Sequence, residues 1–240
     1  MPQRPADPSD LRPGTSGAAG WSDIPTLAED LLLLMFQPRS GTIAGESTLF
    51  YVLGGAVLAD LALGGHLTAA RGRIRSVEGQ APSDALLRSA WGYLSEKPRG
   101  VQAALAAIGP PLREPVLERL VGRGDIDRED RKVLGLFRTT VLHEGGSGRR
   151  AGLLEEVRRV LVDGAEPQAR IAALAALLSA SGTLPQFHHE IPWKSSVIMR
   201  AKELERGNWG AAAAAEAVTR TVTATVVNSA IVASTGLPRG

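Results

Sequence analysis

The chain has 240 residues, of which 44% are hydrophobic and only 4% are aromatic. Ala, Leu and Val supply most of the apolar mass, a composition that favours helices over sheet sandwiches. The chain contains no cysteine, which excludes a disulfide framework, thiol catalysis and cysteine-based zinc sites. A formal net charge of +2 is too small to indicate a nucleic-acid-binding protein.

The first 23 residues are rich in Pro, Gly, Ser and Asp. They carry too little apolar surface to offset the entropy lost on ordering. We therefore predict a disordered tail over residues 1–23 and one domain over residues 24–240. Arg4 and Arg12 in the tail are interpreted as solvated, with a membrane or an acidic partner as the alternative. The tail lacks the apolar segment of a signal peptide, and no uncharged stretch reaches the ~20 residues of a spanning helix. A cytoplasmic location, free or on a membrane face, is expected.

Two apolar helices in residues 26–67 organise the rest of the chain. Thr26 and Glu29 form an S/T-x-x-E capping box, which predicts the start of a helix. This helix is expected to run through the apolar block Leu31–Phe36 and to end before the next proline. The second helix, predicted for Ser47–Leu63, is apolar on nearly every side and too short to span a membrane. It is therefore the predicted central core helix.

A short β-hairpin is predicted after this pair of helices, with Arg71 and Gly72 at its turn. Because side chains alternate along a strand, Arg71, Arg73 and Arg75 are expected on one face. One interpretation of this face is a simple solvated surface. The other is a basic patch that faces anionic lipid head groups.

The spacing of apolar residues predicts the remaining helices, and Gly and Pro residues mark where they end. Their approximate ranges are Pro82–Leu94, Val101–Ile108, Leu112–Val121, Leu153–Leu161, Pro167–Leu178, Pro192–Leu204 and Gly210–Thr235. A loop is predicted for residues 187–190.

The segment from Asp125 to His143 is predicted to hold a charged turn and a second hairpin, because its later part is rich in β-branched and aromatic residues. An apolar tip is expected on this hairpin at Leu134, Leu136 and Phe137.

No residue spacing indicates an enzyme, a metal site or a cofactor. His188, His189 and Glu190 are adjacent, and neighbouring side chains point apart, so they chelate a metal poorly. The chain has no G-x-S-x-G elbow, and its glycine-rich residues 145–148 lack the Lys-Ser/Thr of a phosphate-binding loop. An enzyme would need a deep pocket with convergent titratable groups.

The core pair of helices carries a resemblance to a known family. The segments T-L-x-E-x-L-L-L-L, G-T-x-A and L-x-x-L-A-L-x-G-x-L resemble the opening signature of the Golgi phosphoprotein 3 family. Later segments follow in the same order, including L-R-E and L-V-G-R-G within residues 112–124, so the resemblance covers about residues 24–235. It implies a mainly α, single-domain bundle in which amphipathic helices surround the core helices, with short β-hairpins.

The resemblance also implies a peripheral membrane protein that binds phosphatidylinositol 4-phosphate. In eukaryotic members the pocket uses a tryptophan, an arginine near the core helix, and two arginines three residues apart on a later helix. These positions fall on Gly45, Gly54, Pro110 and Arg113, of which only Arg113 keeps its side chain. Each charge-assisted hydrogen bond contributes ~1.5–3 kcal/mol, so losing two cationic partners is expected to weaken binding strongly.

Two functional hypotheses follow. In the first, the protein is non-enzymatic and docks on anionic membrane lipids through Arg113, with Arg119 predicted to face outward beside it and the Arg71–Arg75 patch as a further contact. The tip residues 134–137 would insert shallowly. In the alternative, the protein is a cytosolic adaptor without specific lipid binding. It would self-associate through the hairpin, burying Leu136 and Phe137, and the resemblance adds tails of membrane proteins as partners. Neither hypothesis involves a nucleic acid.

Overall fold

The computed structural model describes residues 24–133, 137–207 and 220–228. The fold is mainly α, as predicted, with short antiparallel strand pairs. Its labelled α-helices are α1 (Leu27–Met35), α2 (Leu49–Leu63), α3 (Ala85–Ser95), α4 (Val101–Ile108), α5 (Arg113–Gly122), α6 (Arg149–Leu161), α7 (Ala169–Ala180) and α8 (Ser195–Glu205). Two 3-10 helices, η2 (Pro110–Leu112) and η3 (Leu184–Phe187), join them. The strands are β1 (Phe36–Gln37), β2 (Thr42–Ile43), β3 (Leu67–Ala70), β4 (Arg73–Ser76), β5 (Arg99–Gly100), β6 (Ile126–Val133) and β7 (Phe137–Glu144).

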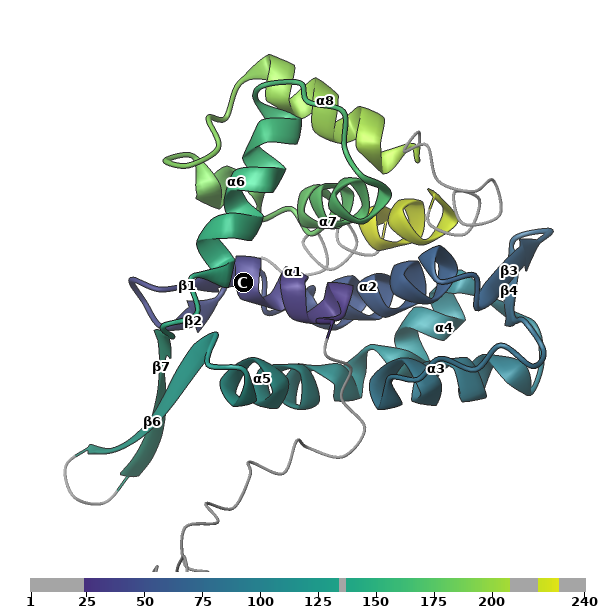
Figure 1. The fold of residues 1–240 in the computed structure, drawn as a ribbon, viewed down its shortest axis with the longest axis horizontal. Helices are drawn as coiled ribbons and strands as arrows, with labels where there is room; N and C mark the ends of the chain where they lie inside the picture. The colour runs from purple at the N-terminus through teal and green to yellow at the C-terminus, as the bar shows by residue number, and fades with distance from the viewer. Residues whose placement is uncertain (1–23, 134–136, 208–219, 229–240) are drawn as a thin grey trace, which may run out of the picture.

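The helices form three layers, with α1 and α2 in the middle (Figure 1). Helices α6, α7 and α8 cover one side of this pair, and α3, α4 and α5 cover the other. Every residue of α1 is buried, as are eleven residues of α2. A helix that is apolar on every side needs neighbours all round, and this arrangement supplies them. The prediction of a central core helix is confirmed.

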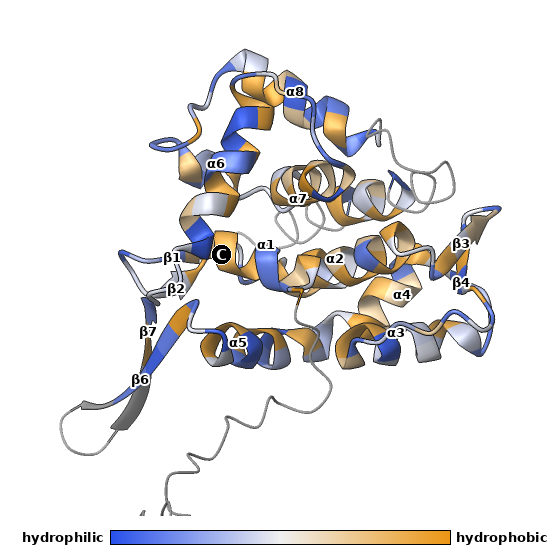
Figure 2. Cartoon of the chain, in the orientation of Figure 1, coloured by the Kyte–Doolittle hydropathy of each residue, from blue (hydrophilic) through white to orange (hydrophobic). Residues whose placement is uncertain are grey.

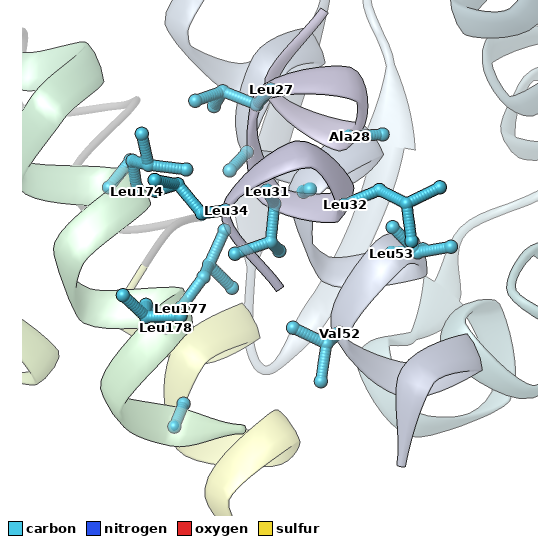
Figure 3. Packing of buried hydrophobic residues seen from close by; sticks show 14 of the residues in the cluster. Leu27, Ala28, Leu31, Leu32, Leu34, Val52, Leu53, Leu174, Leu177 and Leu178 are labelled. Atoms are coloured by element: carbon cyan, nitrogen blue, oxygen red, sulfur yellow. The ribbon is translucent and has the colours of Figure 1, made fainter. Parts of the chain in front are cut away.

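Leucine side chains fill the space between the middle layer and α7 (Figure 3). Leu31 and Leu34 of α1 lie between Leu174 and Leu177 of α7 on one side and α2 on the other. Hydrophilic residues colour the solvent sides of α3, α5, α6 and α8 in Figure 2, whereas α7 has no exposed residue. Burial of this apolar surface is the main favourable term in folding, at about 25 cal/mol per Å².

Glycines allow α2 to approach its neighbours closely. A Cβ atom at Gly54 would lie 3.3 Å from the Leu105 Cδ2 of α4, and one at Gly55 would lie 2.9 Å from the Val226 Cγ2. Val226 belongs to a helical segment, residues 220–228, in which Val222 is also buried. This segment is the described part of the helix predicted for Gly210–Thr235, whose remainder lies outside the described residues.

The first predicted hairpin is confirmed. β3 pairs with β4 through a two-residue turn at Arg71 and Gly72, which have φ values of 52° and 71°. The left-handed conformation of both residues is typical of the turn that matches strand twist in tight hairpins. β5 adds a third strand along β4, which the sequence did not indicate.

The second predicted hairpin is also present, but its strands begin earlier than expected. β6 pairs with β7 from Ile126↔Glu144 to Val133↔Phe137, so residues 127–132, predicted as a charged turn, form a strand instead. The ribbon projects away from the helices (Figure 1), and residues 127–130 are exposed. Because neither face of this part of the ribbon needs to be apolar, charged residues are compatible with the strand.

Two smaller features differ from the predictions. The pair β1–β2 was not predicted, and it closes the connection between α1 and α2 through Phe36↔Ile43 and Gln37↔Thr42. The loop predicted for residues 187–190 begins one residue late, because Phe187 ends η3 and is buried. None of the helices within the described ranges has the length and hydropathy needed to cross a bilayer.

Candidate functional site

A polar pocket of about 360 Å³ surrounds Arg113 at the start of α5. Its walls are the loop before α2, the first turns of α5, and residues of β6 and β7 that include Arg128 and Thr140. Arg113 is the first residue of α5, which begins directly after the 3-10 helix η2. Arg113 and Glu46, which lie 67 residues apart in sequence, therefore meet at one wall of this pocket.

The guanidinium of Arg113 is engaged by carboxylates on two sides. Its Nε and Nη2 atoms donate to the carboxylate of Glu46 at 3.2 and 2.8 Å, and its Nη1 atom donates to Glu114 at 2.5 Å. The other oxygen of Glu114 accepts from Nη2 of Arg128 at 3.1 Å. The hydrogen bonds to Glu46 raise the pKa of Arg113 above its ordinary value. Two cations and two anions thus alternate, and the formal charge of the group is zero.

The other positions carried over from the family pocket lie on neighbouring elements. Gly45 precedes Glu46 and has a φ value of +66°, and a Cβ atom there would meet the Thr183 Cγ2 at 2.7 Å. Gly54 is buried in α2 against Gly109, and the exposed Pro110 begins η2. The structure therefore brings these positions close in space, but of the four only Arg113 presents a cation.

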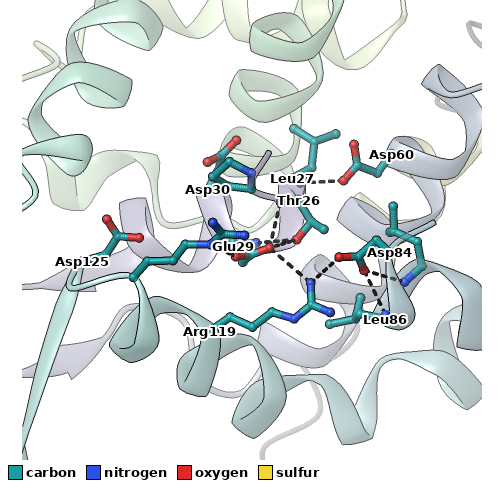
Figure 4. Close-up of polar contacts among 12 residues, drawn as sticks. Thr26, Leu27, Glu29, Asp30, Asp60, Asp84, Leu86, Arg119 and Asp125 are labelled. Atoms are coloured by element: carbon teal, nitrogen blue, oxygen red, sulfur yellow. Dashed lines mark hydrogen bonds and ion pairs between the residues drawn. The ribbon is translucent and has the colours of Figure 1, made fainter. Parts of the chain in front are cut away.

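Arg119 does not face outward, contrary to the prediction. It is only 3% exposed, and its Nη1 donates to Asp84 at 2.7 Å and to Glu29 at 3.5 Å, as Figure 4 shows. Arg119 follows Val116 by three residues and Leu112 by seven, so it lies on the buried stripe of its helix. A burial of this kind is tolerated because carboxylates pair with the guanidinium. Arg119 is therefore unsuited to contact a head group.

Arg119 belongs to a larger network of buried charges around the start of α1. Arg123 donates to Glu29 at 2.7 Å, and Arg149 contacts both Asp30 and Asp125. The network consists of two groups of ion pairs that meet at the adjacent residues Glu29 and Asp30. One group joins Arg119 and Arg123 to Glu29 and Asp84, and the other joins Arg149 and Arg170 to Asp30, Asp60 and Asp125. These residues come from α1, α2, the start of α3, α5, the start of β6, α6 and α7, so one network links both outer layers to the middle layer.

Arg170 bridges two carboxylates in this network. It donates to Asp30 at 2.7 Å, to Asp60 at 2.9 Å and to the carbonyl of Pro25 at 2.6 Å. Burial raises the pKa of Asp30 and of Asp60, and the attraction of Arg170 offsets this only in part. Burial lowers the pKa of Arg170, but the two carboxylates outweigh it and leave the pKa raised. Sequence reasoning missed the network, although two adjacent carboxylates inside the apolar block Leu27–Met35 were a signal.

A second cationic surface lies on the β3–β4 hairpin. Arg71, Arg73 and Arg75 are exposed, whereas Ile74 and Ser76 between and after them are buried. The prediction that strand alternation places all three on one face holds for Arg73 and Arg75 but not for Arg71, because Arg71 lies in the turn between β3 and β4 with a φ value of 52°. Arg73 donates to the carbonyl of Pro98 at 2.8 Å. Within the described part of the chain, none of these three arginines forms an ion pair with a carboxylate.

The two cationic sites lie far apart. The β3–β4 hairpin is at one end of the longest axis of the molecule, and the β1–β2 and β6–β7 pairs are at the other end (Figure 1). The pocket around Arg113 is built partly from β6 and β7. We call Arg71, Arg73 and Arg75 the arginine row, to distinguish it from the Arg113 pocket.

Of the hairpin tip, Leu134 and Leu136 lie outside the described residues, and only the backbone of Phe137 is described, paired with Val133. The rings of His188 and His189 lie with their centroids 3.8 Å apart. Among the described residues, no group of three or more His, Cys, Asp or Glu side chains has the geometry to hold a metal ion.

A protein-family model matches most of the chain. The family model described as Golgi phosphoprotein 3 (GPP34) matches residues 27–221, which span α1 through the start of the 220–228 segment. The comparison with curated proteins gave no match. The matched range covers most of the 240 residues and includes the three layers, the Arg113 pocket and the arginine row. The chain therefore belongs to the Golgi phosphoprotein 3 family.

Proposed function

We propose that this protein is a non-enzymatic peripheral membrane protein that binds anionic phospholipid head groups on the cytoplasmic face of a membrane. Family membership supports this role in general terms. The observation that carries it is the arginine row, because Arg71, Arg73 and Arg75 are exposed together on one hairpin without carboxylate partners among the described residues. By family resemblance, phosphatidylinositol 4-phosphate is the lipid to test first.

The arginine row has enough charge for reversible attachment. A basic residue close to an anionic membrane contributes ~1 kcal/mol, so three contribute roughly 3 kcal/mol. This attraction falls off within about 8 Å at physiological ionic strength. The contribution of Arg113 is smaller in the described conformation, since Glu46 and Glu114 neutralise it. Binding through the row depends on surface charge density more than on the identity of the head group.

Co-sedimentation with liposomes tests the proposal. Neutral, generally anionic and phosphatidylinositol 4-phosphate liposomes are compared at low and moderate salt. The test variant replaces all three arginines of the row by glutamine. The matched control removes the same number of charges from α6 and α8, in the variant Arg158→Gln, Arg159→Gln and Arg200→Gln. We expect salt-sensitive binding that the row variant loses and the control keeps.

An adaptor that self-associates is the second candidate, and the β6–β7 ribbon favours it. Within the described residues, its strands pair only with each other, so both edges offer unpaired backbone groups to another chain. The ribbon projects away from the helices (Figure 1). Light scattering at increasing protein concentration tests this candidate. A monomer throughout the concentration range would contradict it.

A further inference from the structure

We infer that the side chain of Trp21 docks into an apolar cavity between α3 and α5, so that the segment preceding α1 binds to its own domain. Trp21 itself lies outside the described residues, whereas the wall of the cavity is built from residues within them. The arginine row lies on the β3–β4 hairpin, which contributes no residue to this wall. The inference therefore goes beyond the proposed membrane attachment and does not depend on it.

The cavity is a hollow of about 510 Å³ in the outer layer of α3, α4 and α5, and we call it the α3–α5 cavity. Its wall is mainly apolar, and Ser89 and Glu118 add polar atoms to it. Four of its apolar residues are exposed to solvent: Ala85, Ala107, Pro111 and Pro115. A hollow of this size, with apolar walls and a few polar groups, is typical of a binding site.

The start of α1 lies beside one wall of this cavity. The Thr26 N–H donates to Oε2 of Glu29 at 2.8 Å, and the same oxygen accepts from Nη1 of Arg119 at 3.5 Å. Arg119 is also a wall residue of the α3–α5 cavity. One carboxylate oxygen therefore separates the backbone of Thr26 from the wall. Figure 4 shows this contact and, close to it, Leu86, which is another wall residue.

Trp21 is within reach of the α3–α5 cavity. It precedes Thr26 by five residues, and an extended chain covers up to ~3.6 Å per residue, so Trp21 can lie up to about 18 Å from Thr26. Ile24, which lies between them, is 72% exposed and lines a small pocket together with residues 82–84, directly before α3. The first residues of α3 line the α3–α5 cavity. The chain therefore approaches α1 along the edge of this cavity.

Trp21 is the side chain of the N-terminal segment that best matches the cavity. It is the only aromatic residue among residues 1–23, and an indole ring combines a large apolar surface with one N–H donor. The wall offers acceptors for this donor, because the Glu118 carboxylate and the Ser89 hydroxyl have no hydrogen-bond partner among the described residues. Attachment to the domain gives the indole an effective concentration in the millimolar range. A weak intrinsic affinity is therefore sufficient for docking.

Fluorine NMR of the full chain labelled with fluorotryptophan tests the inference. The chain has four tryptophans, and the signal that is absent from Trp21→Phe belongs to Trp21. In the parent we expect this signal to differ from that of free fluorotryptophan and to change little between water and heavy water, because the docked ring is shielded from solvent.

A pair of matched variants connects the signal to the cavity. Ala107→Glu places a charge on the apolar wall and is expected to move the Trp21 signal most of the way to the free position. Ala106→Glu is the control, because Ala106 is exposed on the same helix but is not a wall residue. The control is expected to leave the signal where it is in the parent.

The outcomes separate the possible occupants of the cavity. A Trp21 signal at the free position in the parent would overturn the inference and leave the cavity to a different ligand. Equal effects of Ala107→Glu and Ala106→Glu would also overturn it. A signal that moves to the free position when the parent is diluted would identify the segment of a second copy as the occupant, which contradicts docking within one chain. If Ala107→Glu does not fold, as judged by circular dichroism, Pro115→Glu gives the same test from the exposed first turn of α5.

Discussion

Replacement of Arg119 by methionine tests whether this residue is structural. The substitution keeps much of the side-chain volume but leaves Glu29 and Asp84 buried without one of their cationic partners. Removing one member of a buried ion pair costs ~3–5 kcal/mol. Glu29 keeps its contact with Arg123, and Asp84 still accepts from the N–H groups of α3 that it caps. We therefore expect the free energy of unfolding to fall by about 3 kcal/mol, the low end of this range. For a domain of this size, that loss lowers Tm by roughly 6–12 °C.

Urea unfolding and thermal melting by circular dichroism measure this loss. Arg158→Met is the control, because Arg158 is partly exposed and pairs with exposed acidic side chains. Exposed ion pairs of this kind contribute ~0–1 kcal/mol to the free energy of unfolding. A loss of stability in Arg119→Met equal to that in Arg158→Met would refute the reasoning. If Arg119→Met does not fold, Arg119→Lys keeps the charge and is expected to lose less. A variant that folds well but loses liposome binding would contradict the structural role.

Two further predictions concern the buried charges and the α2–α4 contact. Burial raises the pKa of Asp60 above 3.8, so its contribution to stability is present at low pH and is lost as pH rises through the folded-state pKa. Because asparagine does not titrate, the stability deficit of Asp60→Asn is expected to be largest near about pH 4 and to shrink toward about pH 7. Urea unfolding at several pH values checks this, and a deficit that grows with pH would contradict it. Gly54→Arg places the family's cation at this position. The variant is expected to be less stable than the parent by more than about 3 kcal/mol in the free energy of unfolding, because the site is buried against Leu105 and Gly109. A melting temperature equal to that of the parent would disprove this.

The fold was largely predictable because local signals were strong and consistent with each other. The capping box of Thr26 and Glu29 is formed in the structure, with the Thr26 N–H donating to Glu29 at 2.8 Å. Helix α4 has the predicted bounds, because a glycine lies at each end. The first hairpin turn lies where Arg71 and Gly72 predicted it. Local chemistry of this kind needs no knowledge of distant residues.

The sites were less predictable, because their contacts join distant parts of the chain. Arg119 and Glu29 are 90 residues apart, and Arg170 and Asp30 are 140 apart. A charged residue on a short helix has two interpretations, solvated or paired in the core, and its partner decides between them. Glu46 escaped notice for the same reason, since nothing near it in sequence indicates Arg113.

The central claim, attachment to anionic membranes through the arginine row, is tested most directly by one measurement. The parent protein and the Arg71→Gln, Arg73→Gln, Arg75→Gln variant are sedimented with anionic liposomes at low and moderate salt. We expect the parent to bind in a salt-sensitive manner and the variant to lose most of this binding, with unchanged circular dichroism. Equal binding of the two proteins, or no binding of the parent to any liposome, would contradict the claim.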